Sequence, residues 1–197
     1  MANYTGISAT TAAVTNRIVA STNMSLTPYT IANGGVPVWQ GGAFITVTHT
    51  TVAGTDTLGT MTLVGVGLDG AVQSETITPV ADSTATSTKV YRQVTSLTSV
   101  GWVAVSTADT IVAGVAAGSI CVGSAGTLYA IVINTTAAAA ITISDSKRTI
   151  ATLPSSAVVG HYLYGPGVEF AGFLKVATTS TNDITVIHSG TLPSTIA

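Results

Sequence analysis

Charged side chains are scarce in this chain of 197 residues. Asp, Glu, Lys and Arg together make up 7% of it, against about 25% in an average protein. Six Lys and Arg residues and a net charge of −2 provide no basic stripe for a nucleic acid backbone or an anionic lipid surface. We therefore expect neither nucleic acid nor membrane among the partners. Low charge also indicates a surface that neighbouring subunits cover.

Cysteine is almost absent, and long apolar runs are absent as well. Cys121 is the only cysteine, so an internal disulfide is excluded, and its apolar neighbours predict a buried thiol. Glycines interrupt the weakly polar stretch at 110–126, which is too short for a membrane-spanning helix. The N-terminus lacks the basic and apolar segments of a signal peptide, so we expect synthesis in the cytoplasm.

Residues that carry chemistry are few and scattered. His49, His161 and His188 lie far apart, without the spacing of a metal site. No Gly-x-Ser-x-Gly is present, and the Gly-x-Gly-x-x-Gly at 65–70 belongs to a hairpin rather than to a dinucleotide site. We predict no enzyme and no catalytic, cofactor-binding or metal-binding residues. Turn formation explains most of the acidic residues, namely Asp56, Asp69, Asp82, Asp145 and Asp183.

The chain is rich in Thr and Ser that alternate with aliphatic residues. Residues 44–49 alternate in this way, and Asp69-Gly70 between two such runs predicts a tight hairpin. The nearly continuous apolar run at 128–134 predicts a central strand buried on both faces. Glu75 is expected to pair across a sheet with Lys89 or Arg92. Many short strands at about ten-residue spacing predict an all-β protein of β-sandwich or jelly-roll type.

Composition divides the chain into two small β-domains with an extended N-terminal arm. The arm is either disordered or ordered on a partner. Short first strands are predicted at 17–20 and 25–31, and whether the two halves share one plan stays open. The predicted parts are the arm at 1–16, an N-terminal β-sandwich at 17–115, a Gly/Ala/Ser-rich connection at 116–125 and a C-terminal β-domain at 126–197.

Aromatic residues make up 6% of the chain. Tyr162 and Tyr164, close to Gly160, Gly165 and Pro166, are predicted to lie on a loop. Such a pair either grips a glycan or a protein partner or covers the end of the sandwich. The aromatic residues predicted for the core are Trp39, Trp102, Tyr129, Phe170 and Phe173.

Several segments stand in an order that resembles a family of tailed-bacteriophage virion proteins. The segments are residues 16–21, 26–32, the hairpin at 59–70 with its return at 73–77, 88–97 and 108–111. Residues 126–186 resemble a second small β-domain that is common in phage structural proteins. Together these segments cover most of the chain.

The resemblance implies a minor capsid protein of the decoration or cement type, located in the virion. Its partners would be the major capsid protein or other virion proteins, and the protein would form a homo-oligomer, either a trimer or a dimer. The alternative is a head-fibre, tail or connector component that contacts a glycan on the host surface.

Overall fold

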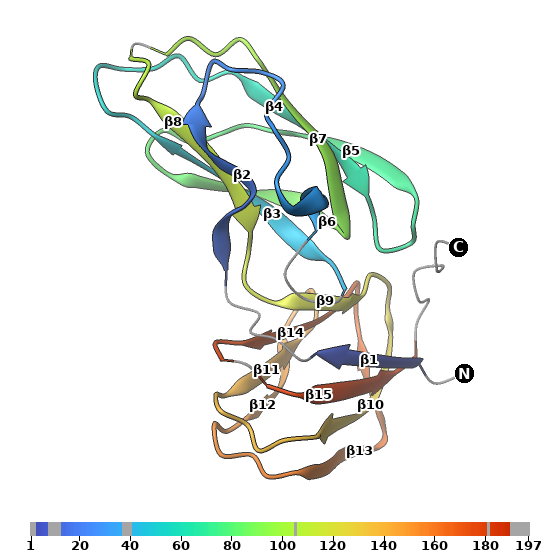
Figure 1. Ribbon diagram of the computed structural model, residues 1–197. Helices are drawn as coiled ribbons and strands as arrows, with labels where there is room; N and C mark the ends of the chain where they lie inside the picture. Colours follow the sequence, from blue (N-terminus) through green and yellow to red (C-terminus); the bar gives the residue numbers. More distant parts are fainter. Residues whose placement is uncertain (1–2, 8–12, 37–40, 105, 181, 190–197) are drawn as a thin grey trace. The chain divides into compact units, whose positions relative to one another are not determined.

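The fold is all-β, as the alternating sequence predicted. The computed structural model describes residues 3–7, 13–36, 41–104, 106–180 and 182–189 (Figure 1). Antiparallel sheets form two compact units in these residues. We call the described residues of 13–36 and 43–116 the N-terminal unit, and those of 3–7, 41–42 and 117–189 the C-terminal unit.

The C-terminal unit is a sandwich of two four-stranded sheets. One sheet has the order β1-β15-β10-β13 and the other β12-β11-β14-β9. Their strands are β1 (Asn3–Ile7), β9 (Ser119–Val122), β10 (Gly126–Ile133), β11 (Ile141–Ser144), β12 (Thr149–Leu153), β13 (Gly160–Phe170), β14 (Leu174–Thr178) and β15 (Ile184–His188). Numbered within the unit, the sheets read 1-8-3-6 and 5-4-7-2, which is the strand order of an eight-stranded jelly roll.

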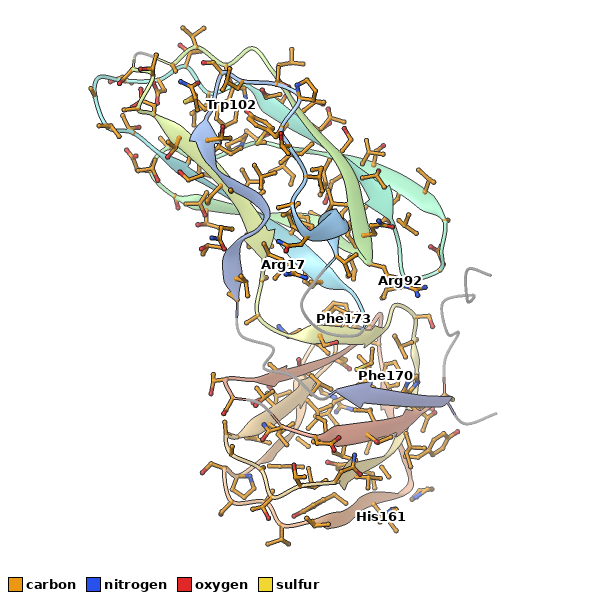
Figure 2. All side chains as sticks on the ribbon, viewed as in Figure 1. Arg17, Arg92, Trp102, His161, Phe170 and Phe173 are labelled. Carbon is orange, nitrogen blue, oxygen red and sulfur yellow. The ribbon has the colours of Figure 1, made fainter. Side chains whose placement is uncertain are left out.

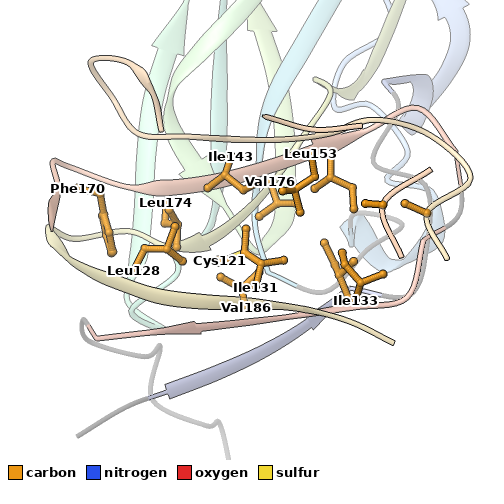
Figure 3. Close-up of a cluster of buried hydrophobic side chains, with 14 of the residues drawn as sticks. Cys121, Leu128, Ile131, Ile133, Ile143, Leu153, Phe170, Leu174, Val176 and Val186 are labelled. Atoms are coloured by element: carbon orange, nitrogen blue, oxygen red, sulfur yellow. The ribbon is translucent and has the colours of Figure 1, made fainter. Parts of the chain in front are cut away.

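Apolar side chains from both sheets meet in the core of this unit. Leu128, Ile131 and Val186 come from the first sheet, and Ile143 and Val176 from the second (Figure 3). All five are fully buried, and each contributes about 1.5–3 kcal/mol through removal of its apolar surface from water. Alternation along β14 and β15 places every second residue in this core.

The N-terminal unit contains seven strands in two sheets. The sheets have the orders β2-β8-β3-β6 and β5-β4-β7. Their strands are β2 (Val14–Asn23), β3 (Ala43–Thr50), β4 (Thr60–Val66), β5 (Val72–Ile77), β6 (Thr84–Tyr91), β7 (Gln93–Val100) and β8 (Thr110–Val115). The predicted hairpin joins β4 to β5, and Gly70 has the positive φ of 79° that a tight turn requires. Ile45, Met61 and Leu97 are fully buried in this unit.

The two units follow the same plan. Numbered within the unit, the seven strands read 1-7-2-5 and 4-3-6, which is the jelly-roll order without its second strand. A non-strand segment, residues 27–35, runs antiparallel to β7 in the place of that strand. The Tyr29 N–H donates to Leu97 O at 3.1 Å, and the Gln93 side chain donates to Gly34 O at 2.9 Å.

Backbone geometry explains why this segment is not the strand that the sequence predicted at 25–31. Pro28 has no N–H to donate to a ladder. Asn33, Gly34 and Gly35 form a short turn, η1, and have φ values of 53°, 61° and 70°. Residues 25–31 form no strand, so the prediction of a strand there was wrong, and the positive φ values at 33–35 belong to the turn that follows.

The structure also adds strands where the sequence suggested an arm and a connection. Residues 3–7 form β1 and pair with β15 of the C-terminal unit, and residues 119–122, inside the expected connection, form β9. Gly42 flanks β9 through a bridge to Ile120. In sequence, the N-terminal unit therefore lies between the first and second strands of the other jelly roll.

Candidate functional site

The densest group of buried ionisable side chains lies at one end of the N-terminal unit. His49, near the end of β3, is 1% exposed. Its Nε2 lies 2.9 Å from Asp56 Oδ2, and its Nδ1 lies 3.3 Å from the backbone N of Asp82. Because that N–H donates to Nδ1, the proton of a neutral imidazole sits on Nε2 and points to Asp56. Trp102, labelled in Figure 2, lies in the N-terminal unit. It packs edge-on against the His49 ring, with ring centroids 6.0 Å apart.

Asp109 is the second buried anchor of this group. It is fully buried, and its Oδ1 accepts from the N–H groups of Val52 at 2.6 Å and Ala53 at 3.2 Å. Its Oδ2 accepts from Ser106 N–H at 2.7 Å. The N–H of Val52, aided by those of Ser106 and Ala53, holds the pKa of Asp109 below its ordinary value, against the opposing effect of burial.

Asp82 connects a third loop to this group. Its Oδ1 accepts from Thr51 N–H at 2.6 Å, and this hydrogen bond lowers the pKa of the Asp82 carboxyl. The three acidic residues and His49 therefore tie together the β3–β4, β5–β6 and β7–β8 loops. We name these loops, residues 51–59, 78–83 and 101–109, the tied loops.

The hydrogen bonds of His49 and the three carboxylates fix the tied loops. Both nitrogens of His49 are engaged, so neither is free to take a proton from a substrate. In the described part of the chain, no three His, Cys, Asp or Glu side chains are grouped so that they could hold a metal ion. Carboxylates that accept several backbone N–H groups fix loop geometry, and fixed loops on a β-scaffold suit recognition.

Exposed valines project from these loops. Val52, Val80 and Val103 are 63%, 51% and 60% exposed. The Val52 N–H donates to Asp109 Oδ1. Val103 and Thr57 exchange two backbone hydrogen bonds between their loops, with N···O distances of 2.9 and 3.0 Å. Val52 and Val103 therefore occupy backbone positions that the buried Asp109 and the bridge hold in place.

Asp145 repeats this use of a carboxylate in the C-terminal unit. Its Oδ1 accepts from the N–H groups of Lys147 and Arg148, each at 2.7 Å, and its Oδ2 accepts from Ala171 N–H at 3.1 Å. The Lys147 N–H has the largest effect and lowers the pKa of Asp145. These contacts give Asp145 the turn role that the sequence predicted. They also join Asp145 to the segment after β13.

Tyr162 and Tyr164 lie on β13 and not on the loop that the sequence predicted. Both are half-buried and pack against the core cluster, and Tyr162 Oη donates to Val158 O at 3.1 Å. Burial raises the pKa of Tyr164. The glycines near them suggested a loop, but alternation through residues 160–164 continues the pairing of β13 with β10.

The remaining predicted side chains are distributed through the two units. Cys121 is buried as predicted, and desolvation raises the pKa of its thiol to about 12, which leaves almost no thiolate nucleophile at neutral pH. Glu75 Oε2 accepts from Thr88 Oγ1 at 2.7 Å and from the N–H groups of Thr88 and Lys89. The Lys89 ammonium instead donates to Ser74 O at 2.7 Å.

The aromatic residues divide between core and partial cover. Phe170 is buried, as predicted (Figure 2), whereas Trp102, Tyr129 and Phe173 are only partly buried. Trp39 lies outside the described residues.

Sequence reasoning missed the tied loops as a unit. Asp109 follows the small residues Ser106, Thr107 and Ala108, which is the pattern of a turn in which a carboxylate caps nearby N–H groups. That local signal was available. Val52 and Ala53 lie 57 and 56 residues before Asp109 in the sequence. Their approach to its carboxylate therefore depends on long-range pairing.

Comparison of the chain with models of known protein families, with curated proteins and with solved structures finds no match. No helix among the described residues is long and apolar enough to cross a membrane.

Proposed function

We propose that this protein is a structural component of a bacteriophage particle, a decoration protein that binds the assembled capsid shell and stabilises it. The observation that carries the proposal is the pair of exposed valines Val52 and Val103, one held through its N–H by the buried Asp109 and the other by its bridge to Thr57, with the exposed Val80 on the neighbouring tied loop. Rigid apolar side chains lose little conformational entropy on docking, so more of their burial energy reaches the interface.

Composition and architecture support the same proposal. A chain with 7% charged residues suits a surface that neighbouring subunits cover, since interface cores are depleted in charge. Jelly rolls are used by viral capsid proteins and also by lectins, and the resemblance of residues 16–111 is to virion proteins. Binding to the assembled shell alone would stabilise that shell by mass action.

The alternative, a fibre or tail component that binds a glycan, would use exposed aromatic side chains. Tyr162 and Tyr164, the candidates from the sequence, are half-buried against the core. Packing against the core leaves less of each ring open for a sugar to stack on, so we prefer the decoration role.

The test is the composition and stability of purified particles. The Val52→Asp, Val103→Asp double variant is expected to lower the number of copies per particle at least about ten-fold, because removal of one buried valine costs about 1.5–3 kcal/mol. Quantitative mass spectrometry of gradient-purified particles gives the copy number, and their heat-induced release of DNA gives shell stability.

Leu163→Asp is the matched control, because Leu163 is 73% exposed and lies in the C-terminal unit. Its particles should keep the wild-type copy number. If wild-type particles lack the protein, the decoration role is wrong. If the double variant binds as well as the wild type, the tied loops are not the docking surface.

A further inference from the structure

The first strand of the C-terminal jelly roll is held at one edge only. β1 pairs antiparallel with β15, with Cα partners from Asn3↔His188 to Ile7↔Ile184. On its other side, β15 pairs with β10. β1 is therefore an edge strand, and its departure would leave the backbone N–H and C=O groups of β15 without their ladder.

The sequence position of β1 separates it from the rest of its own fold. The other seven strands of the jelly roll follow one another from β9 to β15, after residue 117. They supply a core of fifteen buried residues between Cys121 and Val186. β1 is joined to them only through the N-terminal unit, to which residues 8–13 lead, so it can leave the sheet without interrupting that run of strands.

We call the pairing of β1 with β15 the seam. Neither of its strands carries the side chains that usually prevent pairing between molecules. Protected edges bear Lys, other charges, Pro or a bulge. Residues 3–7 read Asn-Tyr-Thr-Gly-Ile, and residues 184–188 read Ile-Thr-Val-Ile-His, without a Lys, Arg, Asp, Glu or Pro. The register of the five pairs is regular throughout. The edge of β15 therefore accepts a β1 segment from any copy of the chain.

We infer that β1 is exchanged between two copies of this chain, so that the β1 of each copy completes the jelly roll of the other. The inference rests on the proposed function, for which the resemblance to virion proteins implies a homo-oligomer. Reciprocal exchange keeps all five residue pairs and produces a two-fold symmetric contact, which is a low-cost route to a dimer. A high local concentration on a shell surface promotes pairing between copies, in competition with the pairing within one copy that covalent connection favours.

The inference predicts which cysteines form a disulfide. Tyr4 and Ile187 are Cα partners across the seam. One chain carries Tyr4→Cys and an affinity tag, and a second chain carries Ile187→Cys, each with Cys121→Ala. Co-expression and mild oxidation should give a disulfide-linked heterodimer at a yield at least about ten-fold above that of a mismatched pair, because a disulfide needs Cα atoms within about 7 Å.

The mismatched pair combines Tyr4→Cys with Val159→Cys, an exposed residue between β12 and β13. A single chain with both Tyr4→Cys and Ile187→Cys separates the two arrangements. Exchange gives a linked dimer on a non-reducing gel, whereas pairing within one copy gives a monomer whose mass shows an internal disulfide. A second pair, Gly6→Cys with Thr185→Cys, repeats the measurement in the same register if the first variant folds poorly.

The inference is overturned if both double variants give only internal disulfides at every protein concentration, or if neither gives any. Such a result would not touch the proposed function, because the copy number on purified particles is measured without these cysteines. Conversely, a linked dimer from a protein that is absent from particles would keep the exchange and reject the decoration role.

Discussion

At the scale of single residues, the ionisable side chains of this protein make hydrogen bonds to groups of the protein itself. Asp109 and Asp145 accept backbone N–H groups, and His49 connects Asp56 to the backbone of Asp82. In a chain with so few charges, the ionisable side chains that are present fix loops. A buried carboxylate that accepts several backbone N–H groups fixes the loops that carry them.

His188 is predicted to make the C-terminal unit sensitive to mild acid. It is fully buried on β15, and desolvation lowers its pKa from 6.5, although Ser189 O opposes the shift. A histidine whose pKa is lower in the folded state binds more protons when unfolded, so stability falls as the pH falls below 6.5. We predict that the denaturant midpoint drops between about pH 7.5 and about pH 5.5.

The variant His188→Gln should lose most of this pH dependence, because it cannot take up a proton on unfolding. His161→Gln is the matched control, since His161 is exposed on β13, and it should retain the wild-type dependence. Urea titrations followed by intrinsic fluorescence at the two pH values provide the measurement. Equal pH dependence in all three proteins would assign the effect to other groups.

At the scale of elements, the N-terminal unit replaces the second strand of the jelly-roll order with a segment that is not a strand. Residues 27–35 follow β7, but they reach it through single hydrogen bonds and a close backbone approach at Gly35. A Cβ at Gly35 would overlap the carbonyl oxygen of Val94, whereas a Cβ at Gly34 would meet nothing within 4 Å. Of the two glycines, only Gly35 is therefore required by packing as well as by its positive φ.

Gly35→Ala is predicted to lower the free energy of unfolding by about 2–5 kcal/mol, the sum of left-handed strain and of overpacking against β7. Gly34→Ala carries only the strain, because its φ of 61° is similar to the 70° of Gly35, and should cost about 1–2 kcal/mol. Chemical denaturation of both variants measures the difference. Equal costs would show that the segment moves away from β7 without penalty.

At the scale of the molecule, low charge governs association. Exposed apolar side chains such as Val72 and Leu163, 77% and 73% exposed, occur in both units, and the net charge is −2. Proteins with little net charge repel one another weakly, so the chain is predicted to self-associate. The association should be apolar in origin and should depend on no ion pair.

Sedimentation velocity provides the test. The weight-average sedimentation coefficient is expected to rise with protein concentration and to change little between about 0.05 and 1 M NaCl, because salt screens charges and not apolar contacts. Sodium sulfate should increase association, since it strengthens burial of apolar surface. A single monomeric species at all concentrations would contradict this prediction and would also remove the basis for strand exchange.

How much could be predicted from the sequence differs between the fold and the site. Strand alternation at 44–49 and the Asp69-Gly70 turn are local signals, and both were placed correctly. The strand at 25–31 was predicted wrongly because strand propensity outweighed Pro28, which has no N–H to donate to a ladder. Tyr162 and Tyr164 were misplaced because nearby glycines resembled a loop.

Sequence by itself determined the all-β class, the buried Cys121 and the scarcity of charge, because each depends on side-chain chemistry or on a period of two residues. Only the tertiary structure decided that both halves follow a jelly roll, that β1 belongs to the C-terminal unit and that Asp109 meets Val52. The physical reason is that strand pairing joins residues far apart in the chain, and alternation specifies which face of a strand is buried but not which strand lies beside it.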